Sequence, residues 1–231
     1  MQFDLYLESG PQHKRTWVYV PALPGCVAFG PTTDQAIENT RPAIRERLDF
    51  LRRHGESQPD PEPIELSVAE HIIERRFLGF GQQVFATDRE PLDAQEAARQ
   101  LLWAEWSREE LVAVARAQTL PLSEAPASGG RSTAAILSHV AGSEWSYVSS
   151  TLGTLPGYSA AIAAIEGAGN EPWAALEAER EAVMTRLHSM TAQELTHVVE
   201  RLDRPPRTAR RMLRRMLEHE WEHVLELRAR L

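Results

Sequence analysis

Alternating hydrophobic and polar positions open the chain and predict a small sheet packed on one helix. Apolar residues recur at every second position in two segments, and short apolar runs form two more, as expected for β-strands. The predicted strands cover residues 3–7, 17–20, 26–29 and 64–68. Thr32 and Gln35 have the spacing of a helix capping box, which predicts a helix from there to about Arg53. The predicted order is therefore β-β-β-α-β.

Further along the chain the apolar residues recur with the period of an α-helix. Asp93 and Glu96 form a second capping-box pair, and Ser132 or Thr133 can cap the next helix. The predicted long helices cover residues 93–117, 132–152, 173–190 and 208–231. The stretch between the second and third of them is predicted to be an irregular crossover with a short helical piece at 160–165. Four long helices with one long crossover predict a four-helix bundle.

The change of period predicts an α+β chain with two domains. Residues 76–91 contain glycines and show no clean period, so the boundary is expected there. The predicted organisation is a small α/β domain at 1–78, a linker at 79–91 and a helical domain at 92–231.

The last predicted helix carries two histidines on a face that should point inward. His219 and His223 are four positions apart, so they lie one above the other on one face. That face reads Met212, Met216, His219, His223, Leu227. A buried neutral imidazole needs partners for its ring nitrogens, and two in succession are costly unless something binds them. A divalent metal ion is the simplest such partner.

A second predicted helix supplies the candidate for a third ligand. Its inward face reads Ile136, His139, Val140, Ser143, Tyr147. Without His139, the pair on the last helix would be interpreted as two partly exposed histidines beside a solvated acidic face of Glu218, Glu220 and Glu222. With His139 included, two different helices each carry histidine on an inward apolar face, which favours a metal site. The remaining histidines are interpreted as surface or ordinary polar residues.

These two segments together resemble one known family. The helix reading Ser132-Thr-Ala-Ala-Ile-Leu-Ser-His139, combined with a last helix reading His219-Glu-Trp-Glu-His223, resembles the DinB-like (DinB/YfiT) superfamily over roughly the last two thirds of the chain. The resemblance implies a four-helix bundle that holds one divalent metal ion through His139, His219 and His223. It also implies a homodimer. The family includes transferases and isomerases that depend on a low-molecular-weight thiol.

The first third of the chain resembles a different family. The turn within Val18-Tyr-Val-Pro-Ala-Leu-Pro-Gly-Cys26, followed by a short strand and a helix, is similar to HicB-like antitoxin domains. The resemblance implies a partial RNase H-like α/β fold without nuclease activity, and a protein partner such as a toxin. Those antitoxins commonly carry a DNA-binding module, whereas a helical domain follows here.

The composition of the chain indicates which binding partners and which cellular compartment fit this protein. The net charge of −8 argues against binding to nucleic acid or to an anionic membrane. The single Cys26 excludes an internal disulfide and fits a reducing compartment. With no secretory signal pattern and no apolar run long enough for a bilayer, the protein is predicted to be cytoplasmic.

Three neutral imidazoles would leave a bound divalent ion with its full charge and with open coordination positions, which is typical of catalytic rather than structural sites. Nitrogen ligands suit Zn or Ni well, and Fe or Mn less tightly. We therefore expect a metal-dependent enzyme, either a thiol-dependent transferase acting with a small thiol cosubstrate or a hydrolase. The alternative is a non-enzymatic protein, in which the HicB-like domain binds a partner and the bundle dimerises or senses a ligand.

Overall fold

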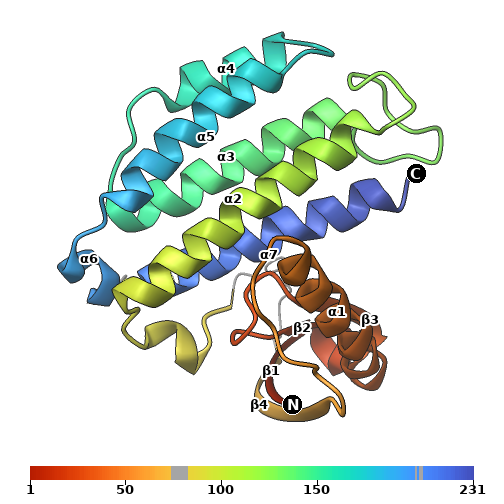
Figure 1. Cartoon of the computed structure of the whole chain (residues 1–231), viewed down its shortest axis with the longest axis vertical. Coiled ribbons are helices and arrows are strands. Elements are labelled where there is room, and N and C mark those ends of the chain that lie inside the picture. The colour runs from red at the N-terminus through yellow and green to blue at the C-terminus, as the bar shows by residue number, and fades with distance from the viewer. Residues whose placement is uncertain (74–82, 201, 203–204) are drawn as a thin grey trace. The chain divides into compact units, whose positions relative to one another are not determined.

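The computed structural model describes residues 1–73, 83–200, 202 and 205–231 (Figure 1). The chain divides into two compact units. The sheet unit comprises Met1–Glu90 and Glu200–Pro206, and the helical unit comprises Pro91–Val199 and Arg207–Leu231. The first residues of the predicted linker, 79–82, lie outside the described residues, so the linker bounds of 79–91 stay a prediction.

The sheet unit has the predicted order of elements. In chain order its helices and strands are β1 (Gln2–Ser9), η1 (Pro11–His13), β2 (Lys14–Tyr19), β3 (Val27–Thr32), α1 (Thr33–Arg53), β4 (Glu65–Ile73) and η2 (Ala86–Arg89). The strands form one sheet in the order β3-β2-β1-β4. β1 pairs antiparallel with β2 and parallel with β4. The parallel pair requires a crossover, and α1 lies within that connection.

One face of the sheet is buried because the apolar residues of β1 alternate. Phe3, Leu5 and Leu7 are buried, while Gln2 and Asp4 between and beside them are exposed. The opposite face of the sheet carries a smaller cluster of Tyr19, Val27 and Phe85. The third strand covers Val27–Thr32 rather than the predicted 26–29. It ends later because it stays paired with β2 up to Thr32, the residue that caps α1.

Helix α1 begins at the predicted cap and locks the turn that precedes β3. The hydroxyl of Thr32 accepts a hydrogen bond from the backbone N–H of Gln35 at 3.3 Å. From the middle of the helix the fully buried Arg47 donates to the carbonyl of Pro24 at 3.0 Å. Its guanidinium lies so close to Gly25 that a side chain there would collide with it, and Gly25 has φ of +90°. The positive φ favours glycine in this turn, and the nearby guanidinium would have to shift for any larger residue.

The helical unit contains four long helices and two shorter ones. They are α2 (Ala94–Arg116), α3 (Thr133–Leu152), α4 (Tyr158–Gly167), α5 (Trp173–His188), α6 (Ala192–Thr196) and α7 (Ala209–Arg228). The predicted caps Asp93 and Ser132 are present, and Thr208 caps the last helix in the same way: each accepts a backbone N–H at the start of a long helix. The crossover after α3 is more regular than predicted, because its helical piece extends over ten residues of α4.

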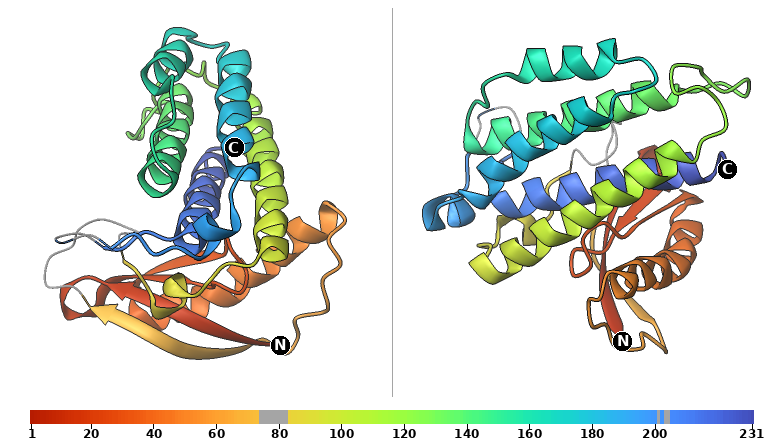
Figure 2. Two further views of the ribbon diagram at one scale, coloured as in Figure 1. Left: turned by 90° about the vertical axis from the view of Figure 1, so that its left-hand side faces the viewer. Right: turned by 45° about the horizontal axis from the view of Figure 1, so that its top comes forward.

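The four long helices pack in a closed cycle. α7 contacts α2 and α3, and α5 contacts the same two helices from the other side. Figures 1 and 2 show these helices running alongside one another. No helix in the described part of the chain is long and apolar enough to cross a membrane.

The core of the helical unit is largely apolar, with a charged cluster in its interior. The apolar part gathers residues from α2, α3, α5 and α7, including Trp145, Val183 and Met212. Beside it lies a buried ionic cluster with at least one member on each long helix. The members of this cluster are Arg108, Glu144, Glu179, Arg180 and Glu220.

Candidate metal centre

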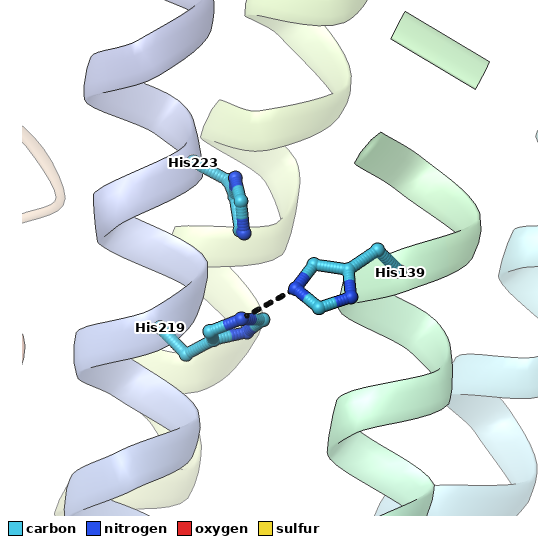
Figure 3. Close-up of side chains that lie close together, drawn as sticks. All are labelled: His139, His219 and His223. Atoms are coloured by element: carbon cyan, nitrogen blue, oxygen red, sulfur yellow. Dashed lines mark hydrogen bonds between the residues drawn. The ribbon is translucent and has the colours of Figure 1, made fainter. Parts of the chain in front are cut away.

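Two helices of the bundle bring three histidine rings together. His219 and His223 lie one turn apart on α7, and His139 faces them from α3 (Figure 3). The stripe predicted for α7 is buried along its whole length, from Met212 to Leu227. Because α3 packs directly against α7, the histidine on each helix points into the seam between them.

The ring nitrogens converge closely. One ligand atom from each of His139, His219 and His223 can be chosen such that all three lie within 4.8 Å of one another. The Nε2 atoms of His139 and His219 are 3.0 Å apart. Among the described residues, this is the one group of three or more histidine, cysteine or carboxylate side chains with the spacing of a metal site.

All three imidazoles are held in the neutral form that binds metals. Burial lowers the pKa of His139 to about 4, helped by the positive charge of Arg131. Burial, together with the neighbouring His223 and Arg215, lowers the pKa of His219 to about 2. The pKa of His223 is also lowered by burial, although the carboxylate of Glu226 opposes that shift. At neutral pH each ring therefore keeps a lone pair available.

Glu226 fixes the orientation of one ring. The Nδ1–H of His223 donates to the carboxylate of Glu226 at 2.7 Å, and Arg230 donates to the other oxygen of that carboxylate at 2.5 Å. With the proton on Nδ1, the lone pair of His223 lies on Nε2. A carboxylate behind a ligating histidine is the common arrangement in protein metal sites, where it sets the tautomer and raises the basicity of the ring.

The donor set fits a divalent ion. Two neutral Nε2 atoms 3.0 Å apart repel each other if both carry lone pairs, and a single proton can relieve only one contact among three rings. Nitrogens bound to one metal ion at about 2.1 Å are separated by roughly 3 Å. The separation of the His139 and His219 nitrogens is therefore that of two ligands of one cation, and the third ligand atom, from His223, lies within 4.8 Å of both.

The structure corrects one interpretation of the sequence around these histidines. The acidic residues of α7 are not a solvated face, because Glu218 and Glu220 expose only 1% and 3% of their surface. Glu218 is held by Arg214 and Arg215, one turn earlier on the helix, at 2.8 Å and 2.9 Å. This intrahelical pairing explains how a carboxylate can be buried there.

The other histidines do not join the cluster. His188 is exposed and lies 3.6 Å from a carboxylate oxygen of Glu105. His71, interpreted as an ordinary polar residue, shares a hydrogen bond of 2.7 Å with the hydroxyl of Ser9 in the sheet unit.

Sequence reasoning missed Glu226 and the ionic cluster. Glu226 could have been found, because it follows His223 by three residues on a helix and so lies beside it. Glu144 also carries a signal, since it is the one charged residue in the twenty of α3. His219 lines the same small cavity of about 10 Å³ as Arg108, Glu144 and Glu220, so the cluster adjoins the histidines.

Replacing Glu226 by alanine is expected to weaken metal binding by about tenfold, because His223 loses the partner that fixes its ring. Glu226→Gln retains an acceptor oxygen and should show a smaller loss. Competition with a chromophoric chelator, on protein without a histidine tag, measures both affinities. Glu109→Ala, which removes an exposed carboxylate on α2, serves as the control. Equal affinity in Glu226→Ala and wild type would exclude an orienting role.

Comparison with known proteins finds a family model that matches each part of the chain. The family model of the DinB superfamily matches residues 86–227, a range that includes all three histidines. The model of the HicB-like antitoxin of bacterial toxin-antitoxin systems matches residues 3–101. Both matches confirm the resemblances found in the sequence.

A curated relative matches a shorter part. The UPF0150 protein Ta0767 of Thermoplasma acidophilum is 41% identical over 51 residues, which is 22% of this chain and 74% of that protein. No solved structure matches the chain.

Proposed function

The chain belongs to the DinB superfamily and carries an N-terminal HicB-like antitoxin domain, and on this basis we propose that it is a metal-dependent enzyme. The convergence of His139, His219 and His223 is the observation that carries the proposal. These three side chains would hold one divalent ion, with Zn or Ni favoured by an all-nitrogen donor set over Fe or Mn. When bound, such an ion supplies a Lewis acid that activates water or a thiol.

The chain's own residues would prepare the site in three ways. Burial and the nearby arginines keep the imidazoles neutral at physiological pH. The hydrogen bond from His223 to Glu226 orients that ring before any ion arrives. The half-buried His139 leaves an approach for a substrate, because its ring lies at the edge of the bundle core rather than within it.

We propose thiol-dependent transfer as the reaction, with a low-molecular-weight thiol as cosubstrate, and metal-assisted hydrolysis as the variant of the same chemistry. Both reactions depend on a metal ion that keeps its full positive charge and has open coordination positions, which is what three neutral ligands provide. The site contains no cysteine of its own, since the single Cys26 is buried in the sheet unit. A thiol nucleophile would therefore have to come from a cosubstrate.

Metal analysis of untagged protein tests the proposal. Wild type purified or loaded with Zn or Ni should carry close to one ion per chain, and His139→Ala should lose most of it, because two ligands on one helix bind weakly. His188→Ala, at an exposed histidine, is the matched control and should retain the ion. An absence of bound metal in wild type after loading would overturn the enzyme proposal. With the ion present, thiol-transfer assays against His139→Ala test the reaction.

The match of residues 3–101 favours a second candidate function. Here the sheet unit binds a partner protein, such as a toxin, and the helical unit dimerises or senses a ligand. His223→Ala separates the candidates, because an enzyme or a metal-dependent sensor requires the ion, whereas a purely structural bundle tolerates its loss. If this variant lacks metal but folds, assembles and binds its partner like wild type, the non-enzymatic function is favoured.

A further inference from the structure

A groove between α2 and α5 is large enough for a small molecule. Its volume is about 740 Å³, within the range of small-molecule sites in proteins. The residues that line it come from these two helices, and none of the three clustered histidines is among them. The groove is therefore a second feature of the helical unit, separate from the candidate metal centre.

The walls of the groove are largely apolar. Leu176 and Met184 are buried on α5, and Val112 faces them from α2. The half-buried Trp173 closes one end, and the guanidinium of Arg116 lies 4.2 Å from the centre of its ring. Arg116 covers that face of the ring, so Trp173 contributes mainly apolar surface to the groove.

The mouth of the groove is acidic. Glu109 on α2 and Glu177 and Glu181 on α5 all line it and are exposed. Within the described residues, no ion pair links any of these three carboxylates to a cation. Glu105, further along α2, faces only the side chain of His188, at 3.6 Å.

The arginines at the floor do not reverse this charge. Arg108 contacts three carboxylates, with Glu144 and Glu179 at 2.8 Å and 3.3 Å and Glu220 closer still. Arg180 is shared between Glu144 and Glu220 and also donates to the carbonyl of Ala104 at 2.5 Å. Two guanidiniums thus face three carboxyl groups at the floor. Of the other lining residues, four are glutamates and one, Arg116, is a cation, so the groove keeps a negative excess that disfavours an anionic ligand.

We propose that this groove binds an amphipathic organic cation. The apolar body of the ligand lies between α2 and α5 against Leu176 and Met184. Its ammonium group stays at the mouth, where the carboxylates of Glu109, Glu177 and Glu181 neutralise it. The carboxyl groups at the floor are already engaged by Arg108 and Arg180, so the exposed carboxylates at the mouth are the ones left to receive an ammonium group.

Titration calorimetry with octylammonium and octanoate tests the charge preference, since the two probes share the same alkyl chain length. The full chain should bind octylammonium saturably with one site, and octanoate much more weakly. Glu177→Gln/Glu181→Gln should weaken octylammonium binding about fivefold, as expected for losing exposed charge contacts. The matched control Glu38→Gln/Glu171→Gln removes the same charge at exposed positions outside the groove and should change little.

A filled groove provides the second test. Ala113 lines the groove and is exposed, so Ala113→Trp should abolish octylammonium binding without disturbing the core. Ala98→Trp adds the same side chain at an exposed site of α2 outside the groove, and should bind like wild type. His139→Ala should also bind like wild type, which separates this site from the metal centre. Absence of saturable octylammonium binding, tighter binding of octanoate, or unchanged binding in Ala113→Trp would overturn the proposal.

Discussion

Replacing Arg108 by methionine is expected to lower the free energy of unfolding of the helical unit by about 3–5 kcal/mol, the usual cost of breaking a buried ionic cluster from one side. The side chain exposes only 7% of its surface and contacts Glu144, Glu179 and Glu220. Without it, three carboxyl groups share the remaining Arg180. Burial and the neighbouring Glu144 already raise the pKa of Glu179 to about 8 in the intact cluster.

Urea unfolding followed by tryptophan fluorescence measures this loss, because every tryptophan except Trp17 lies in the helical unit. Arg99→Met is the matched control on the same helix. Arg99 is exposed and stacks on Trp103 at 5.2 Å, so its loss should cost about 1 kcal/mol or less.

Adding Glu144→Gln to Arg108→Met should recover part of the stability, since it removes one uncompensated charge. A loss in Arg108→Met no larger than in Arg99→Met would show that the cluster does not hold the four helices together.

Acidification is expected to destabilise the metal-free protein by about 2–3 kcal/mol between pH 7 and pH 5 through His219 and His139 alone. An unfolded histidine has a pKa near 6.5 and takes up a proton over this range. Folded His219, with a pKa of about 2, and folded His139, with a pKa of about 4, stay neutral. The unfolded state then binds more protons than the folded state, so stability falls as pH falls through 6.5. His219 contributes about 2 kcal/mol, and the half-buried His139 contributes less because solvent screens it.

The free energy of unfolding of chelator-treated protein, measured at several pH values, gives the dependence of stability on pH. His219→Asn should flatten the dependence of stability on pH, because it removes a group that the folded state keeps neutral. His188→Asn, at an exposed histidine, should leave the slope as in wild type. If His219→Asn and wild type lost the same stability from pH 7 to pH 5, the proposed burial of a neutral imidazole would be wrong.

Local patterns in the sequence determined much of this protein. The caps at Thr32, Asp93 and Ser132 begin helices where predicted, because a capping side chain bonds to backbone groups only three residues away. The pairing of His219 with His223 on a buried face followed from the helical period in the same way. These features depend on interactions within about one turn of chain, and such interactions are legible from residue spacing alone.

Contacts between helices were decided only by the tertiary structure. That His139 would be an inward residue could be predicted, but its 3.0 Å approach to His219 depends on how closely α3 packs on α7. The burial of Glu218 and Glu220 reversed the expectation of a solvated face, because partners for charged residues were available inside the bundle. Arg108 meets carboxylates that lie between 36 and 112 residues away in sequence. No periodicity relates such positions, since their distance is set by helix packing, which sums many weak contacts over the whole core.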